Sequence, residues 1–165
     1  MPVSKRIGVI GLGQRIAHVL AAMQEVGWKF DIAGYADPAP VGAPLLKEHG
    51  IGTGKPYADA QALLKDGPFD LVMIGSPNHL HYEHLLAAFA AGYPIFAEKP
   101  IVRTETESFA LARHLADTKT PPLYIGLVMR SMPIVRAVIA HVDDGRLGEI
   151  VSMDATEHLH PEHGG

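Results

Sequence analysis

The sequence has 165 residues, of which 47% are hydrophobic and 19% are charged, and it contains no cysteine. This composition is that of an ordinary globular protein, and the lack of cysteine excludes disulfides, thiolate metal sites and a cysteine nucleophile. The formal net charge of −4 gives no broad positive field for nucleic acid or anionic lipid, so a small-molecule ligand is expected. No apolar run has the length of a membrane span or the pattern of a signal peptide, and we expect a cytoplasmic protein.

Strand-like and helix-like segments alternate along the chain. Short apolar, β-branched runs predict strands, and runs with a period near 3.6 residues predict helices. The predicted strands are 5–10, 30–36, 70–74, 94–97 and 123–127. The predicted helices are 14–26, 44–49, 58–64, 82–91, 104–116 and 132–142, and Thr104 with Glu107 predicts a capping box. This alternation predicts an α/β fold with a doubly wound parallel sheet of the Rossmann type.

The last segment has a different pattern. Apolar residues at 151, 153 and 155 alternate with Ser152 and Asp154, which predicts a half-exposed strand over 149–155. We therefore expect a Rossmann domain over residues 1–148. Residues 149–165 would then begin a second α/β domain whose remainder lies beyond this sequence.

The first candidate site joins the first predicted strand to the first helix. Gly11 and Gly13 allow a tight turn and close approach of the backbone to a pyrophosphate, which Gln14 and Arg15 would flank at the helix start. Ile16 stands where the usual pattern has a third glycine, and this departure predicts looser packing of the helix or a shifted loop. Because the glycines lie between a strand and a helix, the loop predicts dinucleotide binding.

Asp37 ends the second predicted strand, where a carboxylate can accept the hydroxyls of an adenosine ribose. It follows Gly11 by 26 positions, somewhat beyond the usual spacing of about 20. An acid here would repel a 2′-phosphate, and Pro38 beside it offers no cation. NAD is therefore favoured over NADP, although NADP stays open. The simpler alternative is that Asp37 only caps the next segment.

Two further polar segments follow predicted strands. Ser76, Pro77, Asn78 and His81 come after strand 70–74, at the strand end where ligands of parallel sheets bind, and they also suit a turn and helix start. The run Glu98-Lys99-Pro100 comes after strand 94–97.

Alternation along a strand predicts that neighbours Glu98 and Lys99 point to opposite faces, so each needs its own partner. A lysine exchanges protons near neutrality only when it is desolvated or lies beside another positive charge, such as an oxidised nicotinamide. Pro100 would hold the corner rigid, and a cis peptide bond between Lys99 and Pro100 is predicted.

Three motifs carry a family resemblance: the run EKP at 98–100, SPNHLH at 76–81 and GRLGEI at 145–150. Together they resemble the glucose-fructose oxidoreductase, inositol dehydrogenase and MocA family over nearly the whole chain. The resemblance implies a Rossmann domain followed by an α/β domain with a large open sheet. It also implies an NAD(P)-dependent oxidoreductase of sugars, inositols and related polyols that forms homo-oligomers in its full-length form.

The resemblance also implies roles for individual residues. Lys99 would contact the reacting oxygen and assist proton transfer, while Glu98 and Pro100 shape its surroundings. The other family positions line the cofactor: Pro77 sets a turn, Asn78 and His81 flank the ligand, and Arg130 lies near the nicotinamide end. The family's remaining acid–base residues belong to the second domain, beyond this sequence.

Two alternatives remain open. Residues 79–84 and 158–163 both read His-x-His-x-Glu-His, similar to the ligand run of metallo-β-lactamase-like hydrolases, and would suit a zinc hydrolase. The first run is also explained by a helix start and the second by exposed histidines, and we assign no metal site. The other alternative is a non-catalytic dinucleotide-binding module, because a fold alone does not identify an enzyme.

Overall fold

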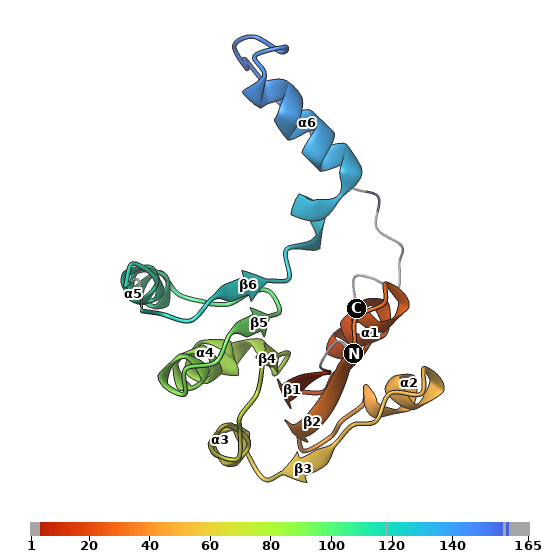
Figure 1. Cartoon of the computed structure of the whole chain (residues 1–165). Helices are drawn as coiled ribbons and strands as arrows, with labels where there is room; N and C mark the ends of the chain where they lie inside the picture. The colour runs from red at the N-terminus through yellow and green to blue at the C-terminus, as the bar shows by residue number, and fades with distance from the viewer. Residues whose placement is uncertain (1–3, 118, 157, 159–165) are drawn as a thin grey trace. The chain divides into compact units, whose positions relative to one another are not determined.

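The computed structural model describes residues 4–117, 119–156 and 158, which form two compact units, Met1–Gly126 and Leu127–Gly165. In the first unit, six parallel strands form one sheet in the order β3-β2-β1-β4-β5-β6 (Figure 1). The order reverses between β1 and β4, as in a Rossmann domain, which confirms the predicted fold class. The strands are β1 (Lys5–Ile10), β2 (Phe30–Ala36), β3 (Lys55–Tyr57), β4 (Leu71–Ile74), β5 (Ile95–Ala97) and β6 (Leu123–Ile125).

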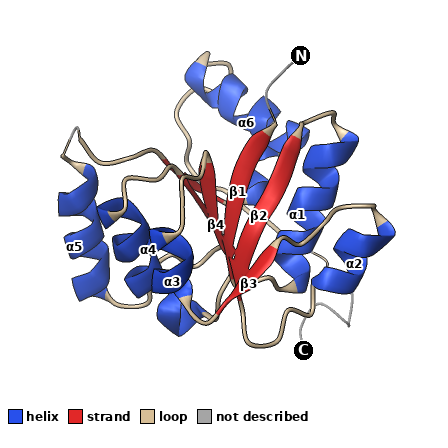
Figure 2. Cartoon of the chain, turned by 60° about the horizontal axis from the view of Figure 1, so that its bottom comes forward, coloured by secondary structure: helices blue, strands red, loops and turns tan. Residues whose placement is uncertain are grey.

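Helices cover both faces of this sheet (Figure 2). One face carries α1 (Gln14–Glu25) and α2 (Ala43–Glu48). The other carries α3 (Ala60–Lys65), α4 (His81–Ala90) and α5 (Glu105–Leu115). A short 3₁₀ helix, η1 (Asn78–Leu80), precedes α4. The second unit contains η2 (Val128–Ser131) and α6 (Pro133–Asp143).

The two faces of β1 and β4 pack into two separate cores, because successive strand residues point to opposite sides. Ile7 and Val9 of β1 pack with Met73 of β4 against α1 and α2, in a cluster that includes Leu20 and Leu46. On the opposite face the cluster is formed by Ile10, Val72, Ile74, Leu85, Phe89 and Leu111. A strand buried on both faces reads as a continuous apolar run, which is why 70–74 was recognisable in the sequence.

The helix ends follow local chemistry. Thr104 accepts a hydrogen bond from the backbone N–H of Glu107, and the Glu107 side chain accepts one in return, so the predicted capping box is confirmed. Helix α1 ends before Gly27, whose φ of +90° lets the chain turn into β2.

Two elements differ from the sequence prediction. The edge strand β3 was missed, because three residues with a central proline give too weak a signal, and it pairs only with β2. The strand predicted over 149–155 is wrong, since none of these residues is assigned to a strand. A strand needs a hydrogen-bonded neighbour, and alternation of side chains does not supply one. Among the described residues, no helix is long and apolar enough to span a membrane.

Candidate functional site

Four loops begin at the same end of the sheet, where the central strands have their carboxyl ends. The backbone N–H of Gly11 donates to the carbonyl of Ala36 at 2.9 Å, and that of Gly75 donates to the carbonyl of Ile10 at 2.8 Å. Pairing also continues past β5, where the N–H of Glu98 donates to Ile74 at 2.9 Å. The glycine loop and the segments that begin at Asp37, Gly75 and Glu98 therefore start side by side, where parallel sheets bind ligands.

Gly11 is required by the way the glycine loop meets the loop after β4. Its φ is +82°, and a Cβ atom on it would lie 2.3 Å from the backbone nitrogen of Ser76. Any other residue would clash with backbone there. Gly11 therefore allows two of the loops to pass each other closely.

Gly13 leaves room for a ligand. A Cβ atom on Gly13 would approach only the carbonyl oxygen of Gly75, at 3.9 Å. Gly13 is also the N-cap of α1, and no side chain caps the N–H groups of the first helical turn. A pyrophosphate fits this place by charge and by hydrogen bonding. Gln14 turns aside and donates from Nε2 to the carbonyl of Val41 at 2.8 Å.

The expectation that Ile16 loosens the packing of α1 is wrong. Ile16 is fully buried, and a Cβ atom on Gly75 would lie 2.2 Å from its Cγ1 atom. The glycine that permits close packing is therefore present, but it lies on the loop after β4. Gly75 begins the polar segment already expected to line the site, but its packing against Ile16 was not predicted, because the glycine motif was read along one loop only.

Asp37 lies beside the glycine loop despite its long spacing. The register pairs Ile10 with Ala36, so the next residues, Gly11 and Asp37, stand at the same level. Asp37 is half-buried, and its Oδ1 atom accepts a hydrogen bond from the N–H of Ala39 at 2.8 Å. This turn is the capping role expected as the simpler alternative, and it fixes the orientation of the carboxylate beside the glycine loop.

Beyond β4, the polar side chains divide into two groups. Pro77 and Asn78 are exposed, whereas Ser76 and His81 are buried. The Ser76 hydroxyl lies 2.8 Å from Nδ1 of His84, a partner that the sequence analysis missed. Burial lowers the pKa of His84, which favours the neutral ring, and a neutral ring nitrogen can accept a hydrogen bond from the Ser76 hydroxyl. The spacing of His81 and His84, three residues apart on a helix, was the available signal.

The corner after β5 separates its acid from its base as predicted. Glu98 is buried, whereas Lys99 and Pro100 are exposed, and the Lys99–Pro100 peptide bond is cis. A Cβ atom on Gly126 would lie 2.9 Å from the Oε1 atom of Glu98, so this glycine makes room for the buried carboxylate.

Arg15 lies in the first turn of α1, and its Nε atom lies 3.3 Å from Oε1 of Glu98. Its contact with the pyrophosphate stays a prediction. Arg130 lies in η2 of the second unit and is exposed. Its contact with the cofactor stays a prediction.

The structure does not bring the histidines of 79–84 together as metal ligands. His81 points its ring nitrogens at the carbonyl oxygens of Ser76 and Pro100, and His84 faces the Ser76 hydroxyl. Among the described residues, no group of three His, Cys, Asp or Glu side chains is arranged to hold a metal ion. The second histidine run lies largely outside the described residues.

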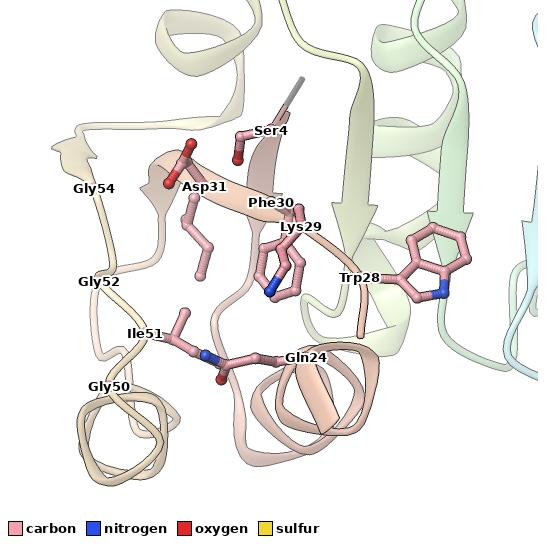
Figure 3. Close-up of a pocket in the computed structure, with 11 residues that line it drawn as sticks. Ser4, Gln24, Trp28, Lys29, Phe30, Asp31, Gly50, Ile51, Gly52 and Gly54 are labelled. Carbon is pink, nitrogen blue, oxygen red and sulfur yellow. The ribbon is translucent and has the colours of Figure 1, made fainter. Parts of the chain in front are cut away.

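A surface hollow of about 590 Å³ lies at the opposite end of the strands, near the start of β2 (Figure 3). It is formed by the end of α1, the start of β2 and the loop before β3, and its lining includes Gln24, Lys29, Asp31, Gly50 and Gly54. None of the candidate site residues lines it, and it lies at the amino ends of the strands. The candidate functional site is therefore formed by the four loops at the carboxyl ends of the strands.

Comparison with known proteins identifies the family of the chain. Residues 5–126 match the model of the GFO_IDH_MocA oxidoreductase family, described as having an NAD-binding Rossmann fold. The chain is 33% identical to D-glucoside 3-dehydrogenase of Escherichia coli over 113 residues, which are 68% of this chain and 31% of that protein. It is 32% identical to inositol 2-dehydrogenase of Pseudomonas savastanoi pv. phaseolicola over 111 residues, 65% of this chain and 32% of that protein.

A solved structure agrees as well. An oxidoreductase from Agrobacterium radiobacter, in complex with NAD⁺, L-tartaric acid and magnesium, superposes with a TM-score of 0.73 at 26% identity. The match covers 89% of this chain and 42% of that one. The chain spans about a third of the length of the two curated relatives. Among the described residues, the histidine geometry gives the zinc-hydrolase alternative no support. The chain belongs to the Gfo/Idh/MocA oxidoreductase family and carries its NAD-binding Rossmann domain.

Proposed function

We propose that the chain is the nucleotide-binding part of a dehydrogenase that acts on a secondary alcohol or ketone of a sugar, inositol or related polyol. The names of the relatives support this substrate class, since one is a D-glucoside dehydrogenase and another an inositol dehydrogenase. The observation that carries the proposal is that Lys99 is exposed at the same end of the sheet as the glycine loop. Bound NAD would supply the hydride acceptor, and NADH the donor.

The loops divide the binding of the dinucleotide among them. Asp37 would accept the hydroxyls of the adenosine ribose, and the first turn of α1 after Gly13 would bind the pyrophosphate. Asn78, on the exposed loop after β4, and Glu98 would flank the nicotinamide end. Asp37 also favours NAD over NADP, because a 2′-phosphate beside its carboxylate would be repelled.

Lys99 would act on the reacting oxygen of the substrate. In reduction its ammonium group would donate a hydrogen bond and then a proton to the carbonyl oxygen, and in oxidation the neutral amine would take up the hydroxyl proton at Nζ. Glu98, the buried neighbour of Lys99, anchors the corner, and the Lys99 side chain is exposed. Substrate contacts from a further part of the protein would complete the site.

The test is a hydride-transfer assay on the chain. The protein is mixed with NAD and with myo-inositol, a D-glucoside or another polyol, and NADH formation is followed by its absorbance. Turnover of at least one polyol supports the proposal. NADH binding without turnover of any compound in the panel, by the chain and also by a longer version that adds the second α/β domain, would contradict the dehydrogenase and favour a non-catalytic dinucleotide module.

The family resemblance also supports a homo-oligomer in the longer form of the protein, with neither nucleic acid nor membrane as a partner. The net charge of −4 agrees with the lack of a nucleic-acid surface. Light scattering of the purified protein measures the oligomeric state.

A further inference from the structure

Ser76 lies where the loop after β4 meets the glycine loop. It is only 8% exposed, and a Cβ atom on Gly11 would come within 2.3 Å of its backbone nitrogen. Its carbonyl oxygen lies 2.6 Å from Nε2 of His81, the first residue of α4. Asn78, which we propose for the nicotinamide end, follows two residues later and is exposed. The position of Ser76 therefore sets where the exposed part of this loop stands.

The side chain of Ser76 is held by a second histidine of α4. The Nδ1 atom of His84 lies 2.8 Å from the Ser76 hydroxyl oxygen. His84 is half-buried and follows His81 by three residues, so the two side chains lie on the same face of the helix. Because a hydroxyl can both donate and accept, this hydrogen bond does not depend on which ring nitrogen of His84 carries the proton.

Helix α4 is a firm base for this contact, whereas the loop before it is not. Leu85 and Phe89 of α4 are buried in the core on that face of the sheet. Pro77 and Asn78 of the loop are exposed, and the backbone N–H of Leu80 closes the turn by donating to the carbonyl of Pro77 at 2.8 Å. A loop without buried side chains of its own keeps one arrangement only when neighbouring groups tether it.

We propose that His84 is a positioning residue for cofactor binding, which fixes the loop that carries Asn78 by holding the hydroxyl of Ser76. His84 acts through Ser76 and not by contact with the cofactor. Without this hydrogen bond the loop would adopt several arrangements, and the affinity for NADH would fall with the fraction of molecules in the arrangement that fits. The proposal rests on the proposed function, because it concerns the loop assigned to the nicotinamide end.

Two amide substitutions of His84 test the contact. The side-chain amide of His84→Asn can take the position of Nδ1, whereas that of His84→Gln lies nearer the position of Nε2, and neither substitution adds a charge. In calorimetric titration, His84→Asn should bind NADH within about twofold of the wild type. His84→Gln should bind NADH about three- to tenfold more weakly, the equivalent of about one hydrogen bond. Equal affinities of all three proteins would overturn the proposal.

A double-mutant cycle with Ser76→Ala identifies the partner of His84. Because both substitutions break the same hydrogen bond, adding His84→Gln to Ser76→Ala should weaken NADH binding by less than about twofold further. Fully additive losses would mean that His84 does not act through Ser76 and would overturn the positioning role. His114→Gln is the matched control, since this half-buried histidine of α5 packs on Phe89, and it should leave the NADH affinity unchanged.

Amide hydrogen exchange tests the loop without any cofactor. In His84→Gln the amide of Leu80 should exchange about three- to tenfold faster than in the wild type, while that of Leu85 within α4 keeps its rate. An unchanged Leu80 rate would overturn the proposal. A wild-type chain that binds no NADH would contradict the proposed function, and faster Leu80 exchange in His84→Gln would then show that His84 holds the loop all the same.

Circular dichroism checks that each variant is folded. If His84→Gln does not fold, Ser76→Ala removes the same hydrogen bond from its other end and should give the same losses of NADH affinity and of Leu80 protection. Wild-type affinity and wild-type protection in Ser76→Ala would overturn the proposal.

Discussion

The Nε atom of Arg15 lies 3.3 Å from the Oε1 atom of Glu98, which joins the first turn of α1 to the corner after β5. The two side chains differ in exposure, with 53% of the Arg15 side chain accessible and 7% of Glu98. The buried carboxylate depends on this partner, whereas the arginine can still approach solvent or a ligand. The pair therefore ties the pyrophosphate end of the site to the lysine corner.

Arg15→Ala should destabilise the domain by about 1–2 kcal/mol, because it leaves a buried carboxylate without its cation. The expected loss is below that of a fully buried ion pair, since half of the Arg15 side chain is exposed to screening water. Chemical denaturation measures the change, and Arg113→Ala on the exposed side of α5 is the control. Equal stabilities of the two variants would contradict the role of the pair.

Gly75→Ala should destabilise the fold by about 1–3 kcal/mol, because the new methyl group would overlap Ile16. Removing the overlap with a second substitution, Ile16→Ala, should make the double variant more stable than the sum of the two single losses predicts. Denaturation of all four proteins gives this coupling. Gly52→Ala is the matched control, since nothing lies within 4 Å of a Cβ atom there. Strict additivity would show that the two residues are not in tight contact.

Lys99→Met should separate binding from chemistry. The side chain is exposed at the corner, so its loss should change NADH affinity by no more than about twofold. The rate of polyol oxidation should fall by about 10²-fold or more, because the proton at the reacting oxygen would have no acceptor. Stopped-flow measurement of NADH formation checks the rate, with Lys65→Met on α3 as the control. A variant with an unchanged rate would remove Lys99 from the proposed mechanism.

Acid should destabilise the first unit through Asp70, which joins the residue before β4 to the start of β1. A hydrogen bond from the backbone N–H of Arg6, followed by the contact with Lys5, lowers the pKa of Asp70. A carboxyl whose pKa is lowered by folding adds stability above its unfolded pKa, and this stability is lost as the pH falls through the folded value.

Asp70→Asn should therefore reduce the free energy of unfolding at about pH 7 and have little effect at about pH 2, where both forms are neutral. Urea denaturation at the two pH values makes the comparison. Asp31→Asn, an exposed aspartate at the start of β2, is the control. A difference between wild type and Asp70→Asn that is the same at both pH values would mean that the charge of Asp70 is not the cause.

Much of this fold could be predicted because its strongest signals are local. The bounds of β1 and β2 agree with the prediction at both ends, since each strand is rich in apolar residues and runs directly into a turn. The capping box at Thr104 is likewise contained within four residues. The edge strand β3 and the segment at 149–155 were misjudged, because pairing with another segment decides whether a strand forms.

The site was predicted in part for the same reason. Residue types at strand ends indicated which loops matter, and the structure brings the loops after β1, β2, β4 and β5 to one edge. The partners across loops could not be read along the chain. Ile16 packs on Gly75, Arg15 pairs with Glu98, and Gly126 makes room for the same carboxylate.

The most direct test of the central claim is calorimetric titration of the chain with NADH and NADPH, with and without EDTA, for the wild type and Asp37→Ala. We predict that NADH binds more tightly than NADPH, that EDTA has no effect, and that Asp37→Ala weakens NADH by about tenfold while narrowing the preference between the two cofactors. A folded chain that binds neither cofactor, or that binds NADH equally well without the Asp37 carboxylate, would contradict this assignment of the site.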